Sequence, residues 1–138
     1  MRRIICASLL VVAPAVAAAQ VQFDLVYNCE VTQECSQEGK CNVKTETVVF
    51  GLTEKDVQQH GEGTYEITYS GITTDAQMLT QFGPMVWSVK GEDIQTLTSI
   101  GVQREMADTD GVSFMTWSRV RLSELPTGLV NFLRCEVR

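Results

Sequence analysis

Residues 21–29 read VQFDLVYNC and carry an apolar side chain at every second position. One face of this extended segment would carry Val21, Phe23, Leu25, Tyr27 and Cys29. A period of two with one apolar face is typical of a half-buried β-strand. Residues 43–50, VKTETVVF, are rich in β-branched side chains and predict a second strand. The polar residues 30–42 between them predict a loop.

Strand signals continue to the end of the chain. The segments with alternation or β-rich composition are 65–69, 85–90, 94–104, 112–122 and 129–137. Turn residues separate them, as in Asp108-Thr109-Asp110-Gly111. Short strands at this spacing predict an all-β fold of about seven or eight strands, either an antiparallel up-and-down barrel or a sandwich.

Residues 74–82 allow two interpretations. Thr74-Asp75-Ala76-Gln77 has the form of a capping box, and apolar residues follow at helical spacing, which predicts a short helix near 75–82. A strand through Met78 to Gln81 also fits. Residues 53–60 also allow two interpretations, an exposed turn or one helical turn capped by Thr53.

The N-terminal residues 1–19 have the three parts of a secretory signal peptide. Arg2 and Arg3 precede an apolar run that begins at Ile4, and small residues end the segment at Ala19. The apolar run is shorter than the roughly 20 residues that span a bilayer. We therefore expect cleavage after Ala19 and export to the periplasm or the cell exterior. The paired arginines leave the twin-arginine route as an alternative to ordinary secretion.

Residues 20–138 are expected to form a single β domain with no membrane segment. The full chain has a formal net charge of −6, and loss of Arg2 and Arg3 would make the remainder more acidic. An acidic surface repels nucleic-acid phosphates and anionic lipid. The composition therefore argues against nucleic-acid and membrane-surface partners.

Four cysteines follow the expected cleavage site: Cys29, Cys35, Cys41 and Cys135. An even number in an exported chain predicts two disulfides, and the spacing lacks the paired C-x2-C of structural zinc sites. Cys29 and Cys135 each lie on the apolar face of an expected strand, and the first and last strands of a closed barrel are neighbours. This register favours Cys29 with Cys135 and Cys35 with Cys41. Pairing of Cys135 with Cys35 or Cys41 remains an alternative.

Catalytic and metal-binding signals are weak. His60 is the only histidine, and its glycine-flanked polar surroundings predict a solvated turn. No serine lies in a G-x-S-x-G motif, and residues 108–111 lack the later ligands of a calcium loop. The sequence predicts a protein that is not an enzyme and has no catalytic residue, metal or cofactor.

The leading expectation is an exported binding module that contacts another protein, as an inhibitor or as part of a cell-envelope assembly. Binding loops are commonly mounted on rigid sheets. Glu34 and Lys40, in the cysteine-pinned stretch, are therefore candidate partner contacts. Trp87 and Trp117 lie in expected strands; they are core residues if buried and candidate anchors if exposed.

The alternative expectation is a β-barrel that holds a small apolar ligand, as the interior of an eight-stranded barrel can. Met85, Met106 and Met115 lie near the tryptophans in the sequence and could supply adaptable apolar surface.

Overall fold

The computed structural model describes residues 22–81, 83–90, 93–100, 112–123 and 125–138. Within these residues the chain forms eight strands: β1 (Leu25–Ser36), β2 (Cys41–Val57), β3 (Gly63–Tyr69), β4 (Ile72–Met78), β5 (Met85–Val89), β6 (Asp93–Ser99), β7 (Val112–Arg121) and β8 (Thr127–Val137). None of the described residues belongs to a helix long and apolar enough to cross a membrane. The expected signal peptide, Met106 and the turn at residues 108–111 lie outside the described residues.

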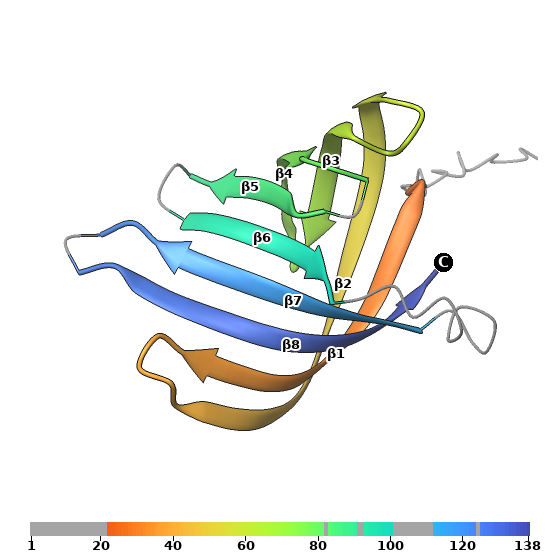
Figure 1. Cartoon of the computed structure of the whole chain (residues 1–138). Helices are drawn as coiled ribbons and strands as arrows, with labels where there is room; N and C mark the ends of the chain where they lie inside the picture. Colours follow the sequence, from red (N-terminus) through yellow and green to blue (C-terminus); the bar gives the residue numbers. More distant parts are fainter. Residues whose placement is uncertain (1–21, 82, 91–92, 101–111, 124) are drawn as a thin grey trace, which may run out of the picture.

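The strands form one closed antiparallel barrel (Figure 1). Each strand pairs with the next along the chain, and β8 returns to pair with β1. This confirms the all-β prediction and selects the up-and-down barrel over the sandwich. Closure also removes the free sheet edges that would otherwise invite aggregation.

The expected helix near residues 75–82 was wrong. Ile72–Met78 is strand β4, which pairs with β3 and β5. Its side chains alternate between outward and inward positions, with Ala76 buried and its neighbours Asp75 and Gln77 exposed. Cross-strand pairing therefore overrides the local capping box. The helical turn considered near Thr53 is absent as well, because β2 continues through Val57.

The predicted loop at residues 30–42 is mostly strand. β1 runs to Ser36 and β2 begins at Cys41, so the connecting turn covers only residues 37–40. The register of β1 shifts at a bulge between Val31 and Gln33. Beyond the bulge Gln33 lies opposite the partly exposed Phe132, and Glu34 lies opposite the buried Asn131. The bulge thus turns Glu34 toward the barrel interior.

Four aromatic rings fill the middle of the barrel: Phe50, Tyr69, Trp87 and Trp117. In five of the six pairs the centroids lie 5.4–6.3 Å apart, and four of these five pairs meet edge to face, which is a favoured aromatic geometry. Trp87 is 3% exposed and Trp117 is 8% exposed, so both tryptophans belong to the core. Within the described residues the middle of the barrel is therefore filled, and the two pockets that reach into the barrel lie at its ends.

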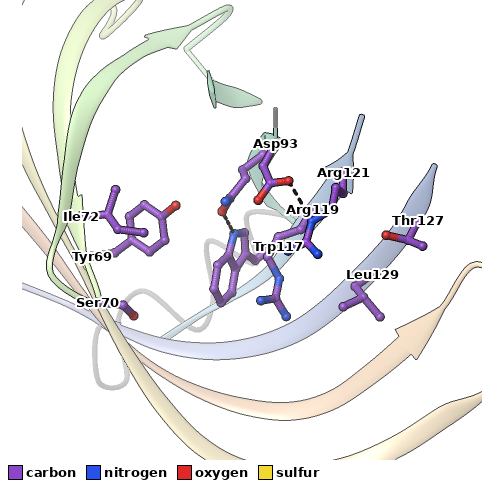
Figure 2. Close-up of a pocket in the computed structure, with 10 residues that line it drawn as sticks. Tyr69, Ser70, Ile72, Asp93, Trp117, Arg119, Arg121, Thr127 and Leu129 are labelled. Carbon is purple, nitrogen blue, oxygen red and sulfur yellow. Dashed lines mark hydrogen bonds and ion pairs between the residues drawn. The ribbon is translucent and has the colours of Figure 1, made fainter. Parts of the chain in front are cut away.

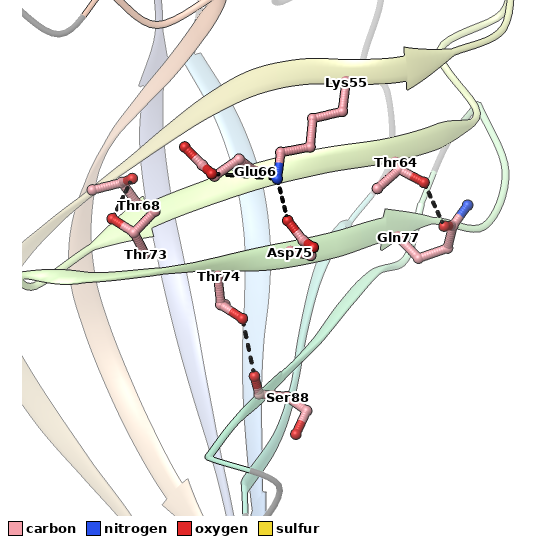
Figure 3. A network of polar contacts seen from close by, with 9 residues as sticks. All are labelled: Lys55, Thr64, Glu66, Thr68, Thr73, Thr74, Asp75, Gln77 and Ser88. Atoms are coloured by element: carbon pink, nitrogen blue, oxygen red, sulfur yellow. Dashed lines mark hydrogen bonds and ion pairs between the residues drawn. The ribbon is translucent and has the colours of Figure 1, made fainter.

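The outer face is polar where β2, β3 and β4 meet (Figure 3). Thr64 bonds Gln77 at 3.2 Å, and Lys55 lies between the carboxylates of Glu66 and Asp75. Cross-strand pairs of this kind stabilise a sheet by fractions of a kcal/mol each. The alternation expected for half-buried strands is thus present on this side of the barrel.

Two disulfides cross-link the strands. Cys29 in β1 bonds Cys135 in β8, and Cys35 bonds Cys41 beside the β1–β2 turn. This is the pairing that the strand register favoured. Disulfide-bonded cysteines are consistent with an oxidising compartment outside the cytosol.

Candidate functional site

One end of the barrel contains a pocket of about 370 Å³ (Figure 2). We call it the arginine pocket, and its lining includes Tyr69, Asp93, Gln95, Trp117, Arg119 and Arg121. Because consecutive strands run in opposite directions, β1, β3, β5 and β7 all end at this side of the barrel. The pocket opens to solvent among these strand ends, and Ser70 and Thr127 belong to its lining.

The inner wall of the arginine pocket consists of core residues with satisfied polar atoms. The indole N–H of Trp117 donates to Gln95 Oε1 at 2.9 Å. The indole N–H of Trp87 donates to the Tyr69 hydroxyl oxygen at 3.2 Å, which leaves the hydroxyl hydrogen of Tyr69 available as a donor. These bonds fix the rings against which a bound group would rest.

Arg119 is the most constrained charged residue of the pocket. Its guanidinium carbon lies 4.4 Å from the ring centroid of Trp117, in cation–π geometry. Its Nη2 donates to Glu34 Oε2 at 3.1 Å. The Asn131 amide, oriented with its oxygen toward Arg119, accepts from Nη2 at 3.2 Å and donates to Glu34 at 3.3 Å. Lys44 contacts the other oxygen of Glu34 at 3.5 Å.

Arg121 lies two residues further along β7, on the same inward face. Its Nε donates to Asp93 Oδ1 at 3.3 Å (Figure 2), and its side chain is 68% exposed. Arg121 is therefore at the rim of the pocket, whereas Arg119 lies deeper, over Trp117. Guanidinium groups bind planar anions such as carboxylates through paired hydrogen bonds.

Three of the four candidate contact residues from the sequence lie at this end. Glu34 binds Arg119 at the pocket, Trp117 lines it, and Lys40 lies on the β1–β2 turn with an 80% exposed side chain that pairs with Glu38. Trp87 is instead buried in the core behind Tyr69.

Sequence reasoning missed both arginines and Gln95. A signal for the arginines was present, because alternation along residues 112–122 places Trp117, Arg119 and Arg121 on the same face. Charged residues at core-facing positions near the end of a strand predict that the barrel interior is polar at that end. Asn131 and Glu34 continue this polar layer on the neighbouring strands.

The other barrel end carries a smaller, apolar pocket of about 180 Å³. We call it the methionine pocket, and its lining includes Tyr27, Leu52, Met78, Met85, Leu97 and Met115. Two of the three methionines noted in the sequence, Met85 and Met115, thus contribute to one surface. Burial raises the pKa of Tyr27 at this end, and the neighbouring Tyr65 raises it further.

His60 lies exposed on the turn between β2 and β3. Within the part of the chain that the structure describes, no three His, Cys, Asp or Glu side chains gather where they could hold a metal ion. Comparison of the chain with protein-family models, with curated proteins and with solved structures finds no match.

Proposed function

We propose that this protein is an exported, non-enzymatic binding module that contacts a protein partner through the barrel end bearing the arginine pocket. The main support is the convergence of Trp117, Arg119 and Arg121 on one open pocket, with Glu34 bonded to Arg119 at its edge. The wall of the pocket is rigid, and its rim is charged. Such a combination suits recognition of a protruding side chain or loop.

The turns around the pocket are held together. The disulfide between Cys35 and Cys41 closes the β1–β2 turn. The backbone N–H of Gln37 donates to the Gly128 carbonyl at 3.0 Å, and the Gly128 N–H donates to Gln37 Oε1 at 2.9 Å. These bonds join the β1–β2 turn to the beginning of β8. A surface ordered in advance loses less conformational entropy when a partner binds.

Export is part of the proposal. The disulfides and the signal-like residues 1–19 both favour a compartment outside the cytosol, either the periplasm or the cell exterior. Mass spectrometry of the protein from its native source tests this step. We expect a mature chain that begins at Gln20 in the exported fraction, and an intact N-terminus in the cytosol would contradict export.

Partner capture tests the binding proposal. The wild type and three variants, Lys40→Glu, Arg121→Glu and Arg138→Glu, are immobilised and exposed to the exported protein fraction. Arg138 follows β8 at the opposite end and is exposed, so its variant is a control matched in charge. A partner whose recovery falls with the first two variants alone supports the proposal. Recovery that none of the three variants changes would contradict it.

The methionine pocket supports a second candidate function, binding of a small apolar ligand. Three thioether side chains line it, and such side chains adapt to ligands of different shapes. Its volume of about 180 Å³ admits only a small molecule or part of a larger one. Native mass spectrometry after gentle extraction tests this idea. An added mass that Met115→Gln removes would support it, and a bare protein mass would count against it.

A further inference from the structure

The arginine pocket holds hydrogen-bond donors that no acceptor of the described residues uses. An arginine carries five N–H donors. In Arg119 the bonds to Glu34 and Asn131 both involve Nη2, whereas the buried Nε has no partner among the described residues. In Arg121 the bond to Asp93 involves Nε. Each arginine thus retains donors that no described residue accepts.

Among the described residues most carboxylate and amide oxygens around the pocket already have a partner; Asp93 Oδ1 accepts from Arg121, whereas Asp93 Oδ2 accepts no hydrogen bond from a described residue. The two oxygens of Glu34 face Lys44 and Arg119, and Gln95 Oε1 accepts from Trp117. The Tyr69 oxygen accepts from Trp87, so the hydroxyl of Tyr69 also retains a donor. The unused donors of Arg119, Arg121 and Tyr69 therefore favour a ligand that supplies acceptors and keeps them away from the Asp93 carboxylate.

We infer that the pocket binds a carboxylate and that this group belongs to an acidic side chain of the partner protein. The inference rests on the proposed function. Arg119 and Arg121 lie two positions apart on β7, which separates their backbones by roughly 7 Å along the strand. A carboxylate that enters between them meets N–H groups from both guanidiniums. Charge-assisted pairs of this geometry are stronger than neutral hydrogen bonds.

The pocket already displays this chemistry with a carboxylate of its own. Glu34 occupies one edge of Arg119, and Trp117 lies beneath the guanidinium. Stacking on Trp117 holds the Arg119 guanidinium in place. The arginine therefore loses little conformational entropy when a carboxylate binds. The negative charge of Glu34 also repels a second carboxylate that binds at Arg119. Removal of the Glu34 charge should therefore tighten carboxylate binding, and removal of the Arg121 charge should weaken it.

The test uses the protein alone and four probes: the capped peptides acetyl-Gly-Asp-Gly-amide and acetyl-Gly-Asn-Gly-amide, sodium acetate and inorganic phosphate. The two tryptophans give two indole N–H signals in NMR spectra. Trp117 contacts Arg119 and reports on the arginines, whereas the buried Trp87, whose N–H bonds the Tyr69 hydroxyl, shifts as well if the ligand reaches Tyr69. We expect the Asp peptide to shift the Trp117 signal at millimolar concentration and the Asn peptide to leave it in place.

Three variants sharpen the result. Arg121→Gln should weaken Asp-peptide binding about fivefold, and Glu34→Gln should strengthen it by a similar factor. Arg138→Gln makes the same charge change at the opposite end and should have no effect. Opposite effects at Glu34 and Arg121 would not follow from a loss of folding, which thermal melts check separately.

Four other outcomes overturn the inference, and a fifth overturns the proposed function. Equal shifts by the Asn peptide would exclude charge recognition, and phosphate binding tighter than the Asp peptide would exclude a carboxylate preference. Acetate binding as tightly as the Asp peptide would assign the pocket to free small carboxylates. If the Asp peptide fails while partner capture still depends on Lys40 and Arg121, only this inference falls. If the peptide binds and capture ignores both residues, the proposed function falls instead.

Discussion

Cys29 and Cys135 lie directly opposite each other at the seam where the first and last strands close the barrel. They are separated by 106 residues in the sequence, whereas Cys35 and Cys41 are separated by 6. A disulfide stabilises a protein mainly by restricting the unfolded chain, and the effect grows with the length of the closed loop. The disulfide between Cys29 and Cys135 should therefore add more to the free energy of unfolding than the one between Cys35 and Cys41.

We expect the double variant Cys29→Ala/Cys135→Ala to lose roughly 5 kcal/mol of unfolding free energy, and Cys35→Ala/Cys41→Ala roughly 2 kcal/mol. Urea unfolding followed by circular dichroism measures both. The short bridge is the control, since it removes the same atoms at the exposed end of a hairpin. Equal losses of unfolding free energy would mean that the pairing of β1 with β8 holds the barrel closed without help from the long-range disulfide.

The seam also illustrates what the sequence could predict. Alternation in residues 21–29 and 129–137 placed Cys29 and Cys135 on core faces, and that was enough to favour their pairing. Closure itself depends on the pairing of β8 with β1, which no local pattern encodes. A sandwich therefore stayed open as an interpretation until the structure was known.

Local signals failed where tertiary pairing competes with them. The sequence from Thr74 to Gln77 has the form of a capping box. These residues nevertheless belong to β4, which pairs with β3 and β5 and alternates its side chains between the two faces of the sheet. The polar residues 30–42 resembled a loop because β1 and β2 there border the polar barrel end and solvent. The arginine pocket was hidden for a related reason: Glu34 and Arg119 meet across 85 residues of sequence.

The hydroxyl of Tyr69 is expected to matter for stability. It accepts the indole N–H of Trp87 inside the aromatic core, where Tyr69 is 3% exposed. Tyr69→Phe leaves that buried N–H without its partner, at a cost of about 1–3 kcal/mol. Chemical unfolding measures the loss. Tyr65→Phe is the control, because the Tyr65 hydroxyl bonds the Gly61 carbonyl at a less buried position and should cost less.

Lys55 separates two carboxylates that directly face each other. Glu66 and Asp75 are cross-strand neighbours, and Lys55 Nζ contacts both (Figure 3). We expect Lys55→Met to lower the melting temperature, because like charges opposite each other destabilise a sheet. The deficit should shrink in high salt and disappear when Glu66→Gln is added. A deficit that salt does not change would indicate lost packing of the lysine stem.

Alkaline pH should destabilise the barrel through Tyr27. Burial raises the pKa of Tyr27 above its ordinary value of 10.0, and the pKa of Tyr65 is raised by burial and by the charge of Glu54. Above about pH 10 the unfolded chain releases these phenolic protons while the folded chain still retains them. The unfolded state then binds fewer protons, so the free energy of unfolding falls as pH rises. Below pH 10 the contribution is fully present.

Urea unfolding at a series of pH values from about 8.5 to about 11.5 would measure this slope. Tyr27→Phe should flatten it, because phenylalanine has no proton to release at the buried position. Lys55 also has a raised pKa, caused first by its hydrogen bond to Asp75, and acts in the same direction. The comparison is therefore made in the Lys55→Met background as well. If Tyr27→Phe leaves the slope of unfolding free energy against pH unchanged in both backgrounds, groups other than Tyr27 cause the loss of stability at alkaline pH.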